Sequence, residues 1–365
     1  MPAFDFDDAF IRERFEQVAT EESLYKAALW NAGAIVNDAS LGAMVGSGDG
    51  RLFTKKFYLD LGEPAQNELG TAPGGDVTNG PTYPDDSDVL VPTHTLGSAE
   101  YQVTKNGPVA SWDLKSIQNR FNFMSDPIAT VESLLSEYWA KYLDKYAVAS
   151  LSGVIAENIL NDGGDLVVDV SDAAVAPDVT NTIQPDTIIV AEDTAGDAAN
   201  FRTIVMHSRV YNNLRVQNLI DFIPSSDGHV NFALYQGKVV VVSDQVEVDS
   251  AGTYPVYTTY ILGDDVLRYG ASLSNGTNDN IIGFEQYRDP RVGRGAGLDQ
   301  IISRVQFALH PMGYTWLDVE VSGSVSAGTG ANIYPNLVDM RSAANWNRAA
   351  SDRKHIPFAA IKSNG

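Results

Sequence analysis

A helical pattern longer than most globular helices constrains this chain more than any other feature of its sequence. Apolar residues recur at spacings of three and four, at Ile128, Val131, Leu135, Tyr138, Tyr142, Tyr146, Ala149 and Gly153. Ser125-Asp126 offers capping side chains, Pro127 suits the first helical position, and Asn161-Asp162-Gly163-Gly164 ends the pattern. We therefore predict one unbroken spine helix over 127–159, roughly 50 Å long. Glu137 and Lys141 are spaced to pair on its exposed side.

Charge and composition exclude several classes of protein. The 365 residues include 25 Lys and Arg against 47 Asp and Glu, a formal net charge of −22. This excludes a general nucleic-acid coat, which needs basic side chains, and disfavours adhesion to an anionic membrane. The absence of cysteine removes disulfides, thiol nucleophiles and thiolate metal sites. With 44% hydrophobic residues the composition is globular. The length favours one large irregular fold or two joined lobes.

The sequence carries no sign of a membrane span or of export. No segment approaches the ~18–20 apolar residues that a membrane helix needs. Acidic residues stand near the N-terminus, where a signal peptide would be basic and then apolar, at Asp5, Asp7, Asp8 and Glu13. We therefore expect synthesis in a cytoplasm.

The first 111 residues read as two appendages. Within residues 1–50, apolar residues recur at roughly helical spacing. The apolar stripe that they form must be buried against the body or a neighbouring subunit. The last part of residues 1–50 contains Gly42, Gly46, Gly48 and Gly50, for which we expect no regular structure. Residues 51–59 and 89–103 alternate like strands around a segment rich in Gly, Pro, Asn and Asp. This pattern predicts a protruding hairpin, which needs support from another chain.

From residue 165 the pattern predicts a mixed α+β body with a small sheet. We expect a helix from Ser208 to about Ile220, and turns at 221–224 and 225–228. Strands are predicted at 166–170, 187–190, 201–206, 237–243, 254–262, 281–287 and 300–309. No internal repeat is present.

The histidines do not form a metal motif. The chain has five, and none pair at helical spacing, namely His94, His207, His229, His310 and His355. His207 beside Ser208 suggests either a nucleophile or the N-terminus of a helix capped by Ser208, and we favour the helix. His310, before Pro311, fits a structural histidine.

Other candidate motifs are equally weak. Gly46-Ser47-Gly48 lacks the spacing of a nucleophile elbow. The glycine-rich run 293–297 fits a flexible loop better than a phosphate site. Asp85, Asp86 and Asp88 suit either calcium or a solvated loop tip, and we favour the loop tip. Asn275-Gly276-Thr277 is a formal glycosylation sequon. We therefore predict no catalytic, cofactor-binding or metal residues, and no enzyme activity.

Three stretches, in order, resemble one family. The first is residues 126–158, which end in Gly-Val-Ile-Ala-Glu-Asn. The second is Met-His-Ser-Arg-Val-Tyr-Asn-Asn-Leu at 206–214, followed by Tyr-Gln-Gly-Lys-Val at 235–239. The third is Phe-Ala-Leu-His-Pro-Met-Gly at 307–313, followed by Ala-Ala-Asn-Trp-Asn-Arg at 343–348 and His-Ile at 355–356. Together they resemble the major capsid proteins of tailed bacteriophages, with the Hong Kong 97-type fold, over about residues 50–365.

The resemblance implies a domain plan. Residues 1–50 would be an N-terminal arm reaching under adjacent subunits, and residues 51–111 an extended β-hairpin loop lying over a neighbour. Residues 112–184 would form the peripheral domain with the spine helix, residues 185–300 the axial domain, and residues 301–365 the return to the peripheral domain. Some family members crosslink a loop lysine to an asparagine of another subunit. Lys55 and Lys56 lie at the base of the loop, so that chemistry is not carried over.

The implied function is an α+β shell subunit of an icosahedral phage head that encloses double-stranded DNA without sequence-specific binding. It would form hexameric and pentameric capsomers and act with scaffolding, portal and decoration proteins. Met1 leads almost directly into the arm, so we expect any scaffold to be a separate protein. An encapsulin-like protein compartment is the main alternative. A hydrolase or lyase with an unrecognised site and a β-rich surface adhesin are the others.

Overall fold

The computed structural model describes residues 28–47, 50–58, 98–115, 127–196, 200–224, 231–271, 282–289, 291, 298–319, 321, 334–350 and 352–365. The chain divides into two compact units. One is Thr54–Tyr101, and the other comprises Met1–Phe53 and Gln102–Gly365.

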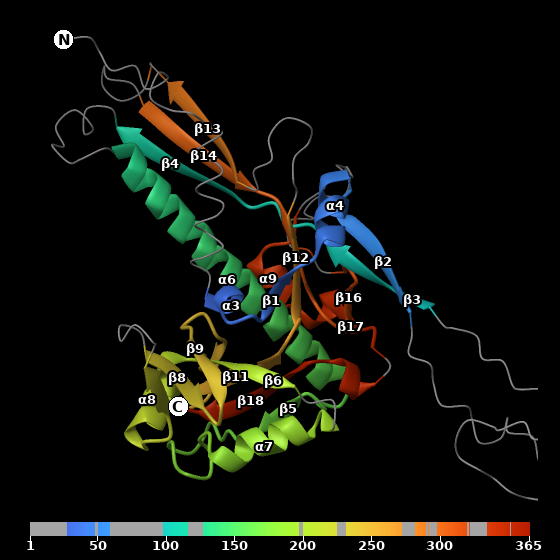
Figure 1. The fold of residues 1–365 in the computed structure, drawn as a ribbon, viewed down its shortest axis with the longest axis vertical. Helices are drawn as coiled ribbons and strands as arrows, with labels where there is room; N and C mark the ends of the chain where they lie inside the picture. Colours follow the sequence, from blue (N-terminus) through green and yellow to red (C-terminus); the bar gives the residue numbers. More distant parts are fainter. Residues whose placement is uncertain are drawn as a thin grey trace, which may run out of the picture. The chain divides into compact units, whose positions relative to one another are not determined.

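The spine helix is confirmed. Helix α6 runs unbroken over Pro127–Asn161, a length of 35 residues (Figure 1). Gly163 and Gly164 follow it with φ of +74° and +76°, a conformation that glycine adopts without strain. Lys141 Nζ donates to Glu137 Oε1 at 2.5 Å on the exposed side, as predicted. The proposed caps Ser125 and Asp126 lie outside the described residues.

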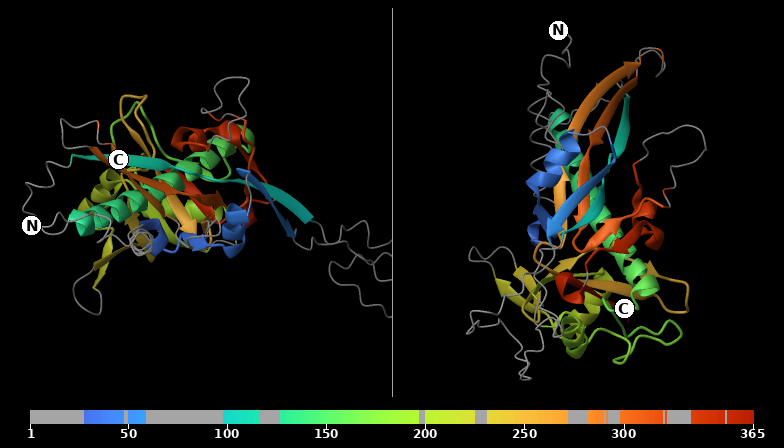
Figure 2. Two further views of the ribbon diagram at one scale, coloured as in Figure 1. Left: turned by 90° about the horizontal axis from the view of Figure 1, so that it is seen from above. Right: turned by 90° about the vertical axis from the view of Figure 1, so that its right-hand side faces the viewer.

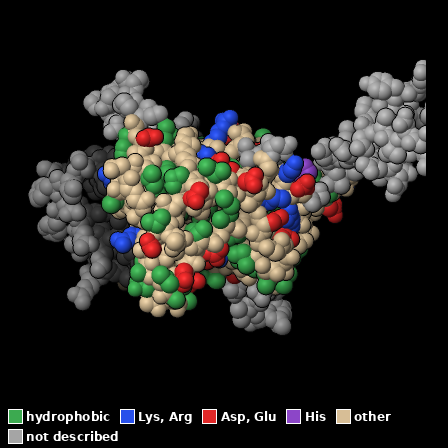
Figure 3. All heavy atoms as spheres, turned by 90° about the horizontal axis from the view of Figure 1, so that it is seen from below, with side chains coloured by type: hydrophobic (Ala, Val, Ile, Leu, Met, Phe, Trp, Pro, Cys, Tyr) green, Lys and Arg blue, Asp and Glu red, His purple; other side chains and the backbone are tan. Residues whose placement is uncertain are grey.

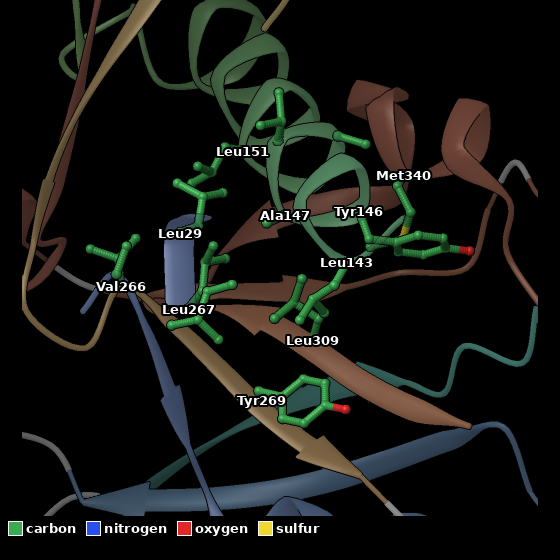
Figure 4. Packing of buried hydrophobic residues seen from close by; sticks show 14 of the residues in the cluster. Leu29, Leu143, Tyr146, Ala147, Leu151, Val266, Leu267, Tyr269, Leu309 and Met340 are labelled. Atoms are coloured by element: carbon green, nitrogen blue, oxygen red, sulfur yellow. The ribbon is translucent and has the colours of Figure 1, made fainter. Parts of the chain in front are cut away.

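The main core forms around the C-terminal half of α6. Leu143, Tyr146, Ala147 and Leu151 of this helix are buried (Figure 4). They share the cluster with residues of a three-stranded sheet, in the order β1–β12–β15. Its strands are β1 Ile35–Asn37, β12 Leu267–Ala271 and β15 Phe307–Pro311. The residues that Figure 4 labels from β12, β15 and the segment before β12 are Val266, Leu267, Tyr269 and Leu309.

The described part of the predicted arm packs into this core. It forms α3 Ala28–Asn31, β1, and α4 Ala39–Ser47. The expectation of irregular structure around Gly42 and Gly46 is wrong, because α4 includes both. A Cβ on Gly42 would lie 2.9 Å from the Ala271 oxygen, and one on Gly270 would lie 2.5 Å from the Gly42 nitrogen. These glycines let the helix approach β12 closely, and the packing offsets their helix cost of about 1 kcal/mol.

The larger sheet has eight strands in the described residues, so the prediction of a small sheet is wrong. Its order is β5–β18–β11–β6–β9–β8–β7, with β10 paired to β11. The bounds are β5 Val167–Asp169, β6 Phe201–Met206, β7 Asp221–Pro224, β8 Asn231–Tyr235, β9 Lys238–Val242, β10 Val248–Asp249, β11 Val256–Gly263 and β18 Phe358–Asn364.

Two features of this sheet differ from the sequence-based expectation. The predicted turn at 221–224 is instead β7, whose Pro224 is tolerated because β7 ends the strand order. The C-terminal strand β18 pairs with β11 from Val256↔Asn364 to Leu262↔Phe358. Residues 358–364 thus lie in the sheet of residues 201–263, although the sequence predicts a return of 301–365 to the peripheral domain.

The predicted strand at 187–190 is a helix. Helix α7 spans Pro185–Asp193, with Pro185 at its start and a reciprocal capping box between Gln184 and Thr187. Its β-branched run suggested a strand, but these start signals and the burial of Thr187, Ile188 and Ala191 on one face favour the helix. Helix α8, Ser208–Val216, confirms the next predicted helix, although it ends before Ile220.

A second three-stranded sheet, the ribbon, lies beside the N-terminal half of α6 (Figures 1 and 2). It comprises β4 Val109–Lys115, β13 Ile282–Asp289 and β14 Leu298–Val305, in the order β13–β14–β4. The single strand predicted at 300–309 is therefore two, β14 and β15. The sequence analysis did not predict β4.

Short elements complete the described structure. Strands β16 Tyr314–Trp316 and β17 Trp346–Arg348 form a two-stranded sheet. Helix α9 is Leu337–Arg341, and 3-10 turns cover Ala343–Asn345 and Arg353–His355. Strands β2 Leu52–Tyr58 and β3 Ser98–Thr104 pair as the base of the expected hairpin. None of the helices in the described residues has the length and apolar character required to cross a membrane.

Candidate assembly surfaces

The ribbon is attached to α6 through one of its faces. Ile301 and Ser303 of β14 are buried, and Trp139 Nε1 of α6 donates to Ser303 Oγ at 2.9 Å. Trp112 of β4, which pairs with Ile301, contacts Tyr138 of α6 edge-to-face at 5.2 Å between ring centroids. Alternation along β4 places Ala110 and Trp112 on this inner face. The ribbon and helix therefore support each other through one layer of side chains.

Large apolar side chains remain exposed at this end of the molecule. We define the spine surface as Leu134, Tyr138 and Trp112, of which Leu134 is 60% and Tyr138 40% exposed. Val109 and Tyr287 are also exposed, on the outer ribbon face beside the Glu285–Arg304 ion pair. Burying one such side chain yields roughly 1.5–3 kcal/mol. Contact with another chain at the spine surface would therefore be favourable.

A second set of exposed apolar residues surrounds α7 and α8. Val216, the last residue of α8, is 81% exposed and borders an open cleft of about 390 Å³ with Val179, Arg209 and Asn213. The set comprises Val175, Val179, Ile189, Val190 and Val216. Figure 3 shows the face at the bottom of Figure 1, where hydrophobic side chains are interspersed with polar and acidic ones. Such a mixture of apolar and polar side chains is typical of non-obligate protein–protein interfaces.

The extended-loop unit has little internal support in the residues that the structure describes. Phe57 and Tyr101 pack at 5.8 Å between ring centroids across β2 and β3. A two-stranded sheet of this size is marginally stable in water. Lys55 is half-buried and Lys56 exposed, both within β2.

The described histidines have structural surroundings. His207, and not Ser208 as predicted, caps α8, because its Nδ1 accepts from the Arg209 N–H at 3.0 Å. Ser208 instead bonds to Asp244 Oδ1 at 3.2 Å through its N–H. The Ser208 side chain and N–H, together with the charge of His207, lower the pKa of Asp244. This arrangement fixes the start of helix α8.

The remaining histidine and loop predictions divide into two groups. His310 is buried with its Nε2 2.7 Å from the Tyr314 carbonyl oxygen, and His355 is exposed in a 3-10 turn. The other predicted positions lie outside the described residues, namely His94, His229, Asp85, Asp86, Asp88, Asn275 and the glycine-rich run 293–297. Sequence reasoning missed Val109 and Trp112, although the alternation of β4 was a usable signal.

Comparison with solved structures defines the fold class. The chain superposes on the capsid of Ralstonia phage GP4 with a TM-score of 0.54 at 12% identity, over 91% of this chain and 87% of that one. A structure from Microbacterium phage Oxtober96 gives a TM-score of 0.51 at 12% identity, over 92% and 90% of the two chains. The chain therefore has the Hong Kong 97-type capsid fold, as its sequence led us to expect.

Comparison with curated proteins adds the role. The major capsid protein of Bacillus phage SPP1 is 25% identical over 356 residues, covering 95% of this chain and 94% of that protein. No protein-family model matches the sequence. The chain is a major capsid protein of the tailed-phage class, a structural subunit that assembles with its own copies into a head shell and resides in the virion.

Proposed function

We propose that copies of this chain form hexameric and pentameric capsomers of an icosahedral shell around a double-stranded DNA genome. The observation that carries the proposal is the match along nearly the whole chain to a phage major capsid protein. The exposed spine surface supports it, because a repeated interface needs apolar area on each copy.

The ranges inferred from the sequence are retained as proposed roles. Residues 1–50 form an arm, of which 28–47 are anchored in the subunit's own core. Residues 51–111 form the loop that lies over a neighbour. Their separation as a compact unit over Thr54–Tyr101 supports this role, as does the weakness of an isolated β-hairpin. Residues 112–184 and 301–365 serve the peripheral domain, and residues 185–300 serve the axial domain, except that β18 at 358–364 joins the axial sheet beside β11.

The proposed partners follow from the same role. The subunit is made in the host cytoplasm and acts with scaffolding, portal and decoration proteins. It encloses DNA without reading its sequence. The net charge of −22 supports an inner wall that does not trap the entering genome. A strongly basic inner wall would contradict that part of the proposal.

We also propose that the subunit is not an enzyme and needs no metal or cofactor. The support is the match along nearly the whole chain to a phage major capsid protein, which indicates a structural role. Turnover of a substrate by the purified subunit would overturn this statement.

The test is to express the chain, alone and with its neighbouring genes, and to image the product by negative stain. We expect closed shells or ring-shaped capsomers. Dispersed monomers in both preparations would contradict the proposal. Protein cargo in place of DNA, with no terminase or portal gene nearby, would favour an encapsulin-like compartment.

A further inference from the structure

A buried carboxyl group lies where α6 ends against the β16–β17 hairpin. Glu157 has 0% exposure. Its Oε1 accepts weakly from Asn161 Nδ2 at 3.4 Å, and its Oε2 has no hydrogen-bond partner in the described part of the chain. Burying an ionised carboxylate without partners costs much folding free energy, whereas burying the neutral carboxylic acid costs far less.

The charges around Glu157 are unbalanced. Asp162 and Asp165 lie in the turn that follows α6, and Arg348 comes from β17. Arg348 Nη1 is 2.8 Å from Asp165 Oδ2 and 3.9 Å from Asp162 Oδ2. The Arg348 guanidinium thus already faces two carboxylates, and an ionised Glu157 would be a third. Arg353 is also near, but it is engaged elsewhere, donating to the carbonyl oxygens of residues 356 and 358.

Two groups from neighbouring strands complete the surroundings. Tyr314 of β16 is paired in register with Arg348, and its buried hydroxyl has no hydrogen-bond partner among the described residues. Burial, and then the charge of Glu157, raise the pKa of Tyr314, so the phenol stays neutral. His310 of β15 contacts the Tyr314 carbonyl oxygen at 2.7 Å and lies 5.9 Å from the Trp346 ring. Its imidazole is the alternative source of a pH effect at this position.

A proton on Glu157 resolves the imbalance. Burial raises the pKa of Glu157 to about 7, with Asp162 adding to the shift and Arg348 opposing it. The described residues offer no group of three or more acidic or histidine ligands arranged for a metal ion, so a proton is the available counter-charge. Glu157 therefore changes charge within the physiological range of pH.

The hairpin beside this cluster depends on its contacts with α6. Strands β16 and β17 pair only with each other among the described residues, and so small a sheet is marginal alone. Trp316 and Trp346 pack edge-to-face at 5.0 Å within it. Trp346 also approaches α6 so closely that a Cβ on Gly153 would lie 2.5 Å from its Nε1.

We propose that Glu157 is a proton-operated latch between the spine helix and the β16–β17 hairpin. Protonated Glu157 leaves Arg348 paired with Asp165 and the hairpin seated on α6. When the proton leaves to solvent, the new carboxylate competes for Arg348 and the hairpin loosens. The latch belongs to the single subunit and does not depend on shell assembly.

The test is hydrogen exchange of peptides from 312–319 and 345–350 in the full-length subunit, corrected for the intrinsic effect of pH. In the wild type, protection from exchange should fall about tenfold between pH 6 and pH 8. The pH dependence should fit the release of one proton with a midpoint near pH 7. Glu157→Gln should abolish the transition, whereas Glu137→Gln, a matched change on the exposed side of α6, should leave it intact.

A second variant separates the latch from a merely structural role. Because Asp162 raises the pKa of Glu157, Asp162→Asn should move the midpoint downward while Arg348 stays in place. A transition that persists in Glu157→Gln would assign the effect to His310 and overturn the proposal. A flat wild-type profile, or a midpoint that Asp162→Asn leaves unmoved or raises, would also overturn it.

Discussion

The two halves of helix α6 have opposite environments. From Tyr146 to Asn158 almost every residue is buried in the main core. From Leu134 to Tyr142 only one side of the helix is buried: Leu135, Trp139 and Ala140 join the core, and Trp139 bonds to the ribbon. Leu134 and Tyr138, on the other side, stay exposed. A single helix thus serves the fold of the subunit at one end and presents apolar surface at the other. Each half should therefore respond to substitution in its own way.

The largest effect is expected at the tightest point of the buried half. A Cβ on Gly153 would lie 2.1 Å from the Met340 carbonyl oxygen, which belongs to backbone and cannot easily move. Gly153→Ala should therefore lower the free energy of unfolding by about 3 kcal/mol, measured by urea denaturation. Gly50→Ala is the control, because its nearest contact would be 3.8 Å away. Equal stability of the two variants would contradict the close packing of α6 against Met340.

The next effect concerns pH. The folded-state pKa of Glu157 is raised from 4.5 to about 7, so its contribution to stability is fully present below pH 4.5 and is lost as pH rises through 7. Between pH 5 and pH 8 the wild type should lose about 2 kcal/mol relative to Glu157→Gln. Thermal unfolding of both proteins at each pH measures this difference. A constant difference would show that the carboxyl group is ionised throughout.

A smaller effect on stability is expected in the exposed half. Leu134→Ala should change the free energy of unfolding by no more than about 0.5 kcal/mol, because its side chain is 60% exposed. The same variant should reduce the yield of shells or capsomers in sedimentation velocity. Loss of stability without loss of assembly would reverse the roles assigned to the two halves.

The smallest effect belongs to the Glu137–Lys141 pair, whose side chains are 50% and 68% exposed. Glu137→Ala should cost no more than about 0.5 kcal/mol, and less in high salt. Denaturation at two ionic strengths measures this cost. A cost above about 1 kcal/mol would mean that the pair is shielded from solvent.

The sequence predicted those parts of the fold whose signals are local. The spine helix was identified from its period and from the glycines that end it, and β6 from its buried run. Helix α7 was missed because its β-branched residues resemble a strand, while the capping box that decides the matter involves Gln184 and Thr187 together. The glycines of α4 misled the prediction because their benefit is a contact with β12, which is remote in the sequence. The sequence could not show that Leu134, Tyr138 and Trp112 form one exposed surface, because this depends on the packing of the ribbon beside α6.

The most direct test of the central claim is chemical labelling at the spine surface. Because the chain has no cysteine, Leu134→Cys introduces a single thiol. Its rate of reaction with a maleimide can be compared in unassembled subunits and in purified shells, each normalised to the denatured chain. We expect rapid labelling of the subunit and labelling at least about tenfold slower in the shell. Equal rates would show that sister copies do not cover this surface, and would contradict the assignment of the N-terminal half of α6 to assembly.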